Sequence, residues 1–384
     1  MAFDLDSALA DTIRVGASDL HLKVPSPPRI RMAGQLMDLP RQDPLRPQDT
    51  LAVKERVLTS EPKRAEFEAN GSSDLSYYTP EGRFRVSAFS QRGSASFVFR
   101  VVPVAPRFDQ LGLPDVVAGF SDARRGLVVV TGPTGSGKST TCAAVLDGIN
   151  HRRACHILTI EDPIEFLYVD RKAIVCQREI GLDAPSHHVA LRAALRQDPD
   201  VIMIGEVRDE ETAMTALRAA ETGHLVMCTL HTIDAAETVQ RFIDLFGEGR
   251  SKLARQMLSA TLVGICSQRL MPAVSGGMAL LSEVLVNSAR VRNLVSEAAP
   301  QDELRKAIAE GDYYGMRTFD QCLVDLVTEG KVSESNALDF ASSGHDFKLM
   351  LEQVGGAARA TAPPTEPARA ALGAQGATTA APGS

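Results

Sequence analysis

The sequence predicts an α/β fold, in which an open parallel β-sheet with helices on both faces follows a small α+β domain. From residue 125 onward, short and continuous apolar segments alternate with amphipathic helical patterns, as a sheet buried on both faces requires. A glycine-rich segment at 132–139 joins the first apolar segment to the next helical pattern. The length of 384 residues exceeds that of one ordinary domain, so we expect two domains.

The composition is that of a globular protein and limits its partners. The chain is 44% hydrophobic and 23% charged, so it can form a hydrophobic core. Its formal net charge of -7 at pH 7 argues against the broad basic surface that duplex-binding proteins carry. We therefore expect no nucleic-acid partner.

Cysteine spacing and hydropathy narrow the class of protein further. The six cysteines form no CxxC pair, so neither a zinc knuckle nor a redox motif is expected. The chain begins with acidic Asp4 and Asp6 where a secretory signal would be basic, and no apolar stretch approaches the ~18 residues of a spanning helix. We expect a cytoplasmic protein without direct membrane insertion, whose membrane contact goes through a partner.

Residues 1–105 predict the small α+β domain. Turn patterns at 80–82 and 92–93 separate three strand patterns, which cover 74–78, 83–90 and 96–102. Because successive strand side chains point to opposite faces, Phe84 and Val86 lie on one face and Arg83 and Arg85 on the other. The domain is therefore expected to carry a basic face.

Three further segments complete the predicted domain organisation. Residues 106–114 are expected to be a linker, because Pro106 and Pro114 lie at its two ends and Pro103 lies shortly before it. The second domain is expected at 115–352, with a helical region at its C-terminal end and strands at 127–130, 157–160, 201–204 and 225–230. Residues 353–384 are rich in Ala, Pro, Thr and Gly. Since such a segment buries too little apolar surface to offset its ordering entropy, we expect a disordered tail.

The glycine-rich segment fits the phosphate-binding pattern G-x-x-x-x-G-K-[ST], between a strand and the helix expected at 140–150. Its glycines let backbone N–H groups surround phosphates, and the helix N-terminus adds a positive end. Lys138 would reach the β- and γ-phosphates and Ser139 would ligate Mg²⁺. We expect ATP and Mg²⁺ as ligands. The expected nucleotide-binding residues are Gly132, Pro133, Thr134, Gly135, Ser136, Gly137, Lys138, Ser139 and Thr140.

Each of the next three predicted strands ends in a polar residue: Glu161, Glu206 and His231. In an open parallel sheet the ligand lies beyond the carboxyl ends of the strands, so we expect these groups to meet the phosphate loop in one crevice. Glu206 would hold or shape the Mg²⁺ environment, Glu161 would accept a proton from the attacking water, and His231 would sense the γ-phosphate. The fold would then be a RecA-like P-loop NTPase motor domain.

Each of these residues also has a structural interpretation. A strand-end carboxylate can simply be solvated, and His231 can be a satisfied structural histidine. His224 follows a helix stop, so it can be a capping or packing residue instead of a catalytic one.

Phosphoryl transfer also needs an arginine near the γ-phosphate, which another domain or subunit can supply. The basic face of the small domain offers Arg83, Arg85 and Arg100. The structural alternative for these three is an exposed, solubilising strand face.

Five segments resemble signatures of the secretion-superfamily ATPases. They are residues 132–140, 157–166, 177–183, 194–209 and 219–232. Within that superfamily the chain resembles the retraction ATPases of type IV pili, the PilT family, from residue 16 to about residue 351. The resemblance implies a RecA-like ATPase domain behind a small α+β, PAS-like domain.

The same resemblance implies roles for individual residues and for partners. It places Glu161 in the acidic "Asp box", Glu206 in Walker B, and His224 with His231 in the His box. Arg83, Arg85 and Arg100 match arginines that are implicated in nucleotide contact. The family further implies a homohexameric ring that acts on an inner-membrane platform protein (PilC-like) and, through it, on the pilin filament.

The chain departs from the family pattern in one element. Residues 290–295 align with the AIRNLI-like element of retraction motors and keep Arg292, Asn293 and Leu294, but Arg290 replaces the first alanine. Residues 318–321 and 345–351 also resemble the accessory retraction ATPases (PilU-like), which stay an alternative.

Three other classes stay open. Pilus-assembly and type II secretion ATPases usually carry a tetracysteine zinc module, which this sequence lacks. A nucleic-acid translocase would need a basic, aromatic-lined channel, whereas aromatic residues are 5% of this chain. A nucleotide-binding regulator without turnover would not need Lys138, Glu161 and Glu206 together.

Overall fold

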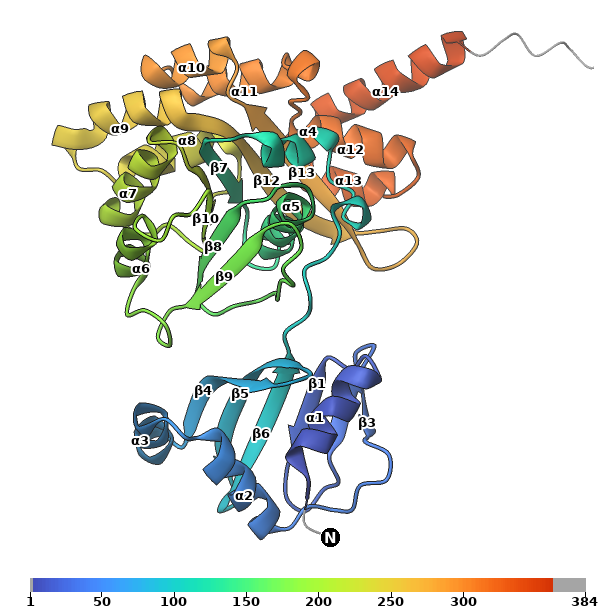
Figure 1. The fold of residues 1–384 in the computed structure, drawn as a ribbon. Coiled ribbons are helices and arrows are strands. Elements are labelled where there is room, and N and C mark those ends of the chain that lie inside the picture. The colour runs from blue at the N-terminus through green and yellow to red at the C-terminus, as the bar shows by residue number, and fades with distance from the viewer. Residues whose placement is uncertain (1–2, 362–384) are drawn as a thin grey trace, which may run out of the picture.

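The computed structural model describes residues 3–361 and contains two β-sheets, one in each of two domains joined by an extended segment (Figure 1). The first sheet is antiparallel, with the strand order β3-β2-β1-β6-β5-β4. Its strands are β1 (Asp19–Leu22), β2 (Arg29–Met32), β3 (Gln35–Asp38), β4 (Ser72–Thr79), β5 (Gly82–Gln91) and β6 (Ser94–Val101). The hairpins expected from the turn patterns are present. Arg92 and Gly93 both have positive φ angles, +50° and +75°, as a tight two-residue hairpin requires.

Helices cover one face of this sheet. The helices are α1 (Leu5–Arg14), α2 (Pro47–Val57) and α3 (Glu61–Asn70). Phe84 and Phe99 of the sheet are fully buried in a core that also contains Leu9 of α1 and Phe67 of α3. The predicted alternation is therefore confirmed for the apolar face of β5.

The second sheet has the strand order β13-β12-β7-β11-β10-β8-β9. Neighbours are parallel except for the antiparallel pair of β12 and β13. Its strands are β7 (Gly126–Thr131), β8 (His156–Glu161), β9 (Ile174–Glu179), β10 (Val201–Ile204), β11 (Leu225–Leu230), β12 (Leu262–Pro272) and β13 (Met278–Val286). The four strands expected from apolar runs lie side by side at its centre.

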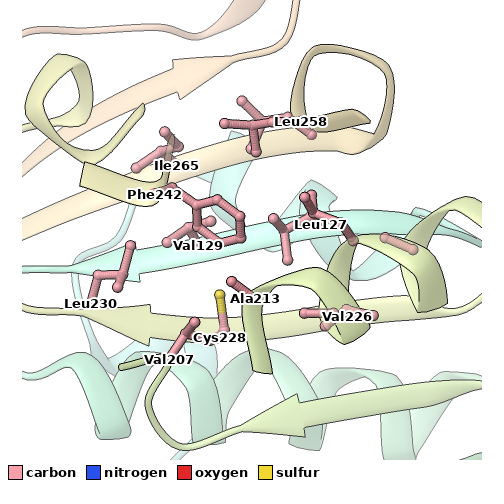
Figure 2. Close-up of a cluster of buried hydrophobic side chains, with 14 of the residues drawn as sticks. Leu127, Val129, Val207, Ala213, Val226, Cys228, Leu230, Phe242, Leu258 and Ile265 are labelled. Carbon is pink, nitrogen blue, oxygen red and sulfur yellow. The ribbon is translucent and has the colours of Figure 1, made fainter. Parts of the chain in front are cut away.

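Helices cover both faces of the second sheet. On one face lie α6 (His187–Ala194), α7 (Glu210–Glu221), α8 (Ala235–Asp244), α9 (Glu248–Thr261), α10 (Ala289–Ser296) and α11 (Gln301–Ala309). On the other lie α4 (Asp115–Gly119) and α5 (Lys138–Arg152). Figure 2 shows Leu127 and Val129 packed with Phe242 of α8. Val128 and Val130 face the opposite core with Leu146 of α5. Both faces of β7 are thus buried, which explains its uninterrupted apolar sequence.

The C-terminal helices form a separate small core against the β12–β13 hairpin. They are α12 (Phe319–Thr328), α13 (Glu334–Phe340) and α14 (Gly344–Thr361). Short 3₁₀ turns lie at η1 (Phe108–Gln110), η2 (Phe120–Asp122) and η3 (Asp312–Tyr314). No helix within residues 3–361 is both long and apolar enough to cross a bilayer.

The structure differs from the predicted organisation in three places. Strands β9, β12 and β13 were not predicted, because β9 is a half-exposed edge strand and β12 and β13 carry buried polar residues. Helix α14 extends to Thr361, into the segment 353–384 expected to be a tail. Residues 362–384 lie outside the described part of the chain. Within the expected linker 106–114, Phe108 and Leu111 pack against the core between the second sheet and helix α5.

Candidate nucleotide site

The phosphate loop connects β7 to α5, and its backbone requires glycine at defined positions. Gly132, Gly135 and Gly137 all have positive φ angles. A Cβ atom at Gly132 would lie 2.3 Å from the Gln268 carbonyl oxygen and 2.5 Å from the Ser136 Oγ atom, so any other residue would displace the loop. Gly137 ends the loop, and helix α5 then begins at Lys138. The free N–H groups of this helix start suit an anion.

Lys138 is held against the loop that precedes it. Its ammonium donates to the carbonyl oxygens of Gly132 at 2.8 Å and Pro133 at 3.0 Å. Burial lowers the pKa of Lys138, and the nearby carboxylate of Glu206 opposes this shift. The lysine therefore lies at the phosphate loop, near enough to the Glu206 carboxylate for the two charges to interact.

Glu161 is a buried carboxylate at the end of β8. Its Oε1 atom accepts hydrogen bonds from Thr159 Oγ1 at 2.6 Å and Gln177 Nε2 at 3.1 Å. Burial raises the pKa of Glu161, and these two donors partly offset that effect. A carboxylate with a raised pKa is a better proton acceptor than an exposed one, and the two donors fix its orientation.

Glu206, at the end of β10, has two cationic or protonatable neighbours. Its carboxylate lies 2.7 Å from Arg208 and 3.3 Å from His231 Nε2. The hydrogen bond from Arg208 is the main reason why the pKa of Glu206 is lowered. Glu206 is therefore an ionised group next to the phosphate loop, suited to organise a cation or water.

These groups meet in one cavity of about 450 Å³ at the carboxyl edge of the second sheet. Its lining includes the expected residues Thr134, Gly135, Gly137, Lys138, Ser139, Thr140, Glu161, Glu206 and His231. Gly132, Pro133 and Ser136 belong to the same loop, and Ser136 is buried beneath it. The expected convergence of loop, two carboxylates and one histidine is present in the structure.

His224, which was also expected at the site, does not line this cavity. It precedes β11, whereas His231 follows it, so the two histidines lie at opposite ends of one strand. The ring Nδ1 of His224 is 3.0 Å from the Ala219 carbonyl oxygen, at the end of α7. The capping interpretation fits this position, because a parallel strand delivers only its carboxyl end to the ligand edge.

The three arginines of the small domain are each paired with an acid of the same chain. Arg83 is buried and forms a hydrogen-bonded ion pair with Glu179 of β9. Arg100 donates to Asp19 at 2.9 Å. Arg85 lies 3.9 Å from Glu165, which itself lines the cavity. These ion pairs largely neutralise the expected basic face within the chain. None of the three arginines is among the described residues that line the cavity.

Three residues at or beside the cavity were not predicted from the sequence. Arg208 and His187 line the cavity, and Gln177 orients Glu161 from the neighbouring strand. Arg208 lies two residues after Glu206 but beyond the end of β10, so strand periodicity does not predict its position. Gln177 could not be predicted either, because its pairing with Glu161 depends on the order of β8 and β9.

The donor set fits Mg²⁺ bound together with a nucleotide. The Ser139 hydroxyl and the carboxylates of Glu161 and Glu206 all line the cavity. Mg²⁺ prefers such oxygen ligands and usually takes only one or two from the protein, with phosphates and water supplying the rest. Ser139 and Glu206, the two ligands expected from the sequence, are both among the lining residues.

Comparison with known proteins identifies the family. A family model described as "Type II/IV secretion system protein" matches residues 2–279. The chain belongs to this family. It is 43% identical over 348 residues to the type IV pilus retraction ATPase PilT of Pseudomonas aeruginosa, covering 90% of this chain and 100% of that protein.

Two further matches place the chain within the type II/IV secretion family. The Pseudomonas aeruginosa type IV pilus ATPase PilU is 38% identical over 354 residues, which cover 91% of each chain. A crystal structure of the pilus retraction motor PilT with bound ADP superposes with a TM-score of 0.80 and 40% identity, over 91% of this chain and 100% of that one. The predicted fold class and the predicted resemblance are both confirmed.

Proposed function

We propose that this chain is an ATP-hydrolysing motor that powers retraction of type IV pili, and hence twitching motility. The observation that carries the proposal is the meeting of Lys138, Glu161, Glu206 and His231 in one cavity next to the phosphate loop. Such an arrangement is suited to phosphoryl transfer to water. The relatives named as pilus retraction ATPases support pilus retraction as the work that is done.

The residues of the chain divide the reaction between them. Backbone N–H groups at the start of α5 and the Lys138 ammonium bind and orient the phosphates. Glu161 takes a proton from the attacking water, for which its buried and doubly hydrogen-bonded carboxylate is suited. His231 and Glu206 form a pair that can respond to the γ-phosphate. Mg²⁺, when bound beside Ser139, supplies charge neutralisation for the phosphates.

We infer a cytoplasmic homohexamer that docks at the inner membrane on a platform protein (PilC-like) and acts through it on the pilin filament. The support is the family membership and the similarity to a pilus retraction motor. Arg83 and Arg85 pair with acids of the second domain, so movement of the small domain would release either arginine toward a nucleotide. Arg100 pairs with Asp19 inside the small domain and would move with it.

Phosphate release from purified protein tests the enzymatic part. Glu206→Gln removes the ionised partner of Arg208 and His231 at almost constant volume, so kcat should fall by about 100-fold or more while ATP binding is retained. Lys138→Ala should instead abolish nucleotide binding. Turnover at the wild-type rate in Glu206→Gln would contradict the assignment of the site.

A deletion strain tests the direction of work. Loss of a retraction motor should leave excess pili that do not shorten and should abolish surface motility, whereas loss of an assembly motor should leave no pili. An accessory, PilU-like role is the second candidate, because residues 318–321 and 345–351 resemble those proteins. A chain that restores motility only beside another retraction ATPase would establish that role.

A further inference from the structure

Four buried hydroxyl groups form a connected network next to the cavity without lining it. Thr131 Oγ1 donates to Ser267 Oγ at 2.9 Å. Thr238 Oγ1 lies 2.6 Å from Thr232 Oγ1 and 3.4 Å from Thr131 Oγ1. All four side chains are at most 5% exposed. Buried hydroxyls are costly unless they are paired, so this network specifies one arrangement of the segments that carry them.

The network connects two parts of the nucleotide site. Thr131 is the last residue of β7 and directly precedes Gly132, whose carbonyl oxygen accepts from Lys138. Thr232 directly follows His231, which pairs with Glu206. Thr238 belongs to α8 and contacts both threonines. One helix residue therefore joins the phosphate loop to the segment of the sensing histidine.

Thr238 has one hydroxyl proton, so it can donate a full hydrogen bond to only one acceptor. The nearer acceptor is the Asp234 carbonyl oxygen at 2.6 Å, one turn earlier in the chain, and the farther one is Thr131. With its proton directed to Asp234, the Thr238 oxygen accepts the hydrogen bond from Thr232. A bond to the carbonyl four residues earlier is common for threonine in helices. The hydrogen bond from Thr232 is additional to it. The 3.4 Å contact with Thr131 is then a packing contact, because the Thr131 proton is directed to Ser267.

We propose that Thr238 is a positioning residue for ATP hydrolysis: by accepting a hydrogen bond from Thr232 and packing against Thr131, it keeps His231 and the phosphate loop at a fixed separation. The inference rests on the proposed ATPase function and adds to that site a residue outside the cavity lining. Since a small displacement of a group that contacts the transition state is costly, the effect should appear mainly in kcat.

The test compares Thr238→Val with Thr238→Ser by steady-state ATP hydrolysis. Valine removes the hydroxyl, so kcat should fall by about tenfold while KM changes by less than about threefold. Serine keeps the hydroxyl, so its kcat should stay within about twofold of wild type. Thr12→Val is a matched control, because the buried Thr12 hydroxyl also donates to a carbonyl four residues earlier, at 2.7 Å, but in the small domain.

Thr232→Val tests the same contact from the other side. It should reproduce the loss of kcat, and the Thr232→Val/Thr238→Val double variant should fall no further than either single variant, because both remove one interaction. Wild-type kcat in Thr232→Val, an equal loss in Thr238→Ser, or an equal loss in Thr12→Val would each overturn the proposal. If Thr238→Val does not fold, Thr232→Val and Thr238→Ser still decide. Absence of hydrolysis by the wild-type protein would instead refute the proposed function.

Discussion

The Nε2 atom of His231 lies 3.3 Å from the Oε1 atom of Glu206, which joins the ends of the neighbouring strands β10 and β11 at the nucleotide site. The His231 side chain is 49% exposed and the Glu206 side chain 20%, so the imidazole reaches the cavity while the carboxylate anchors it. His224, at the other end of β11, bonds instead to the end of helix α7. The two histidines therefore lie in different environments, one at the cavity and one at a helix end.

Replacing each histidine by alanine should distinguish these two environments. His231→Ala should lower kcat by about 10- to 100-fold, because the group proposed to sense the γ-phosphate is lost. His224→Ala should leave kcat within about twofold and cost about 1 kcal/mol of stability, since only a hydrogen bond at a helix end disappears. ATPase kinetics and thermal unfolding of both variants measure the difference. Equal losses of kcat would contradict the placement of His224 outside the site.

The loss of ATPase activity at low pH should follow the protonation of Glu161. Burial raises the pKa of this carboxylate above its ordinary value of 4.5, and a proton acceptor works only when it is ionised. Activity should therefore be lost, as the pH falls, at a higher pH than an exposed glutamate would give. Gln177→Ala removes a donor that lowers this pKa, so the loss of activity should shift to a still higher pH.

The control for this profile is Gln240→Ala, because Gln240 bonds to Asp244 on the exposed surface of α8. Its kcat should follow the wild-type curve at every pH. Loss of activity at the same pH in Gln177→Ala as in wild type would show that another group limits the reaction.

The ion pair of Arg83 and Glu179 should stabilise the contact between the two domains. Both side chains are nearly buried, 4% and 8% exposed, and Glu179 also accepts from Ser76 at 2.7 Å and Ile164 N at 3.0 Å. Arg83→Ala leaves a buried carboxylate without its cation, so the free energy of unfolding should fall by about 3–5 kcal/mol.

Arg85→Ala provides the comparison for Arg83→Ala. Arg85 lies on the same strand, but its pair with Glu165 is exposed and 3.9 Å long, so the loss should be about 1 kcal/mol or less. Chemical denaturation of both variants at neutral pH gives the two values. Similar losses would mean that Arg83–Glu179 is no stronger than a surface pair.

Glu283 should make stability depend on pH. This carboxylate of β13 accepts from the Ala235 N–H at 2.8 Å, and burial raises its pKa to about 7. The neighbouring charges are Asp234, which raises this pKa further, and Arg269, which lowers it. Because the folded state holds the proton up to a higher pH than the unfolded state, this contribution to stability is full below about pH 4.5 and is lost as the pH rises toward and through 7.

Glu283→Gln keeps an acceptor for Ala235 and cannot ionise, so it should abolish this dependence. The free energy of unfolding of the variant, measured relative to wild type, should rise by about 1–3 kcal/mol from pH 5 to pH 8. Thermal unfolding at both pH values measures the gain. A difference between variant and wild type that is the same at both pH values would show that Glu283 does not titrate in this range.

Local patterns were sufficient for the centre of the motor domain. Strands β7, β8, β10 and β11 were predicted because each has a continuous apolar run, and α5 because it follows the glycine-rich loop. The site at the carboxyl edge was also predictable. Parallel strands bring their ends to one edge, so residues that follow the strands must converge there whatever the detailed packing.

By itself, then, the amino-acid sequence determined the phosphate loop, the central strands and the residues that end them, because each is encoded within a few neighbouring positions. Only the tertiary structure decided which candidates work together. It paired Arg83 with Glu179, placed His224 at the far end of β11, and joined Thr131 to Thr232 through Thr238. These contacts depend on strand order and helix packing between segments far apart in the chain, about which a local pattern carries no information.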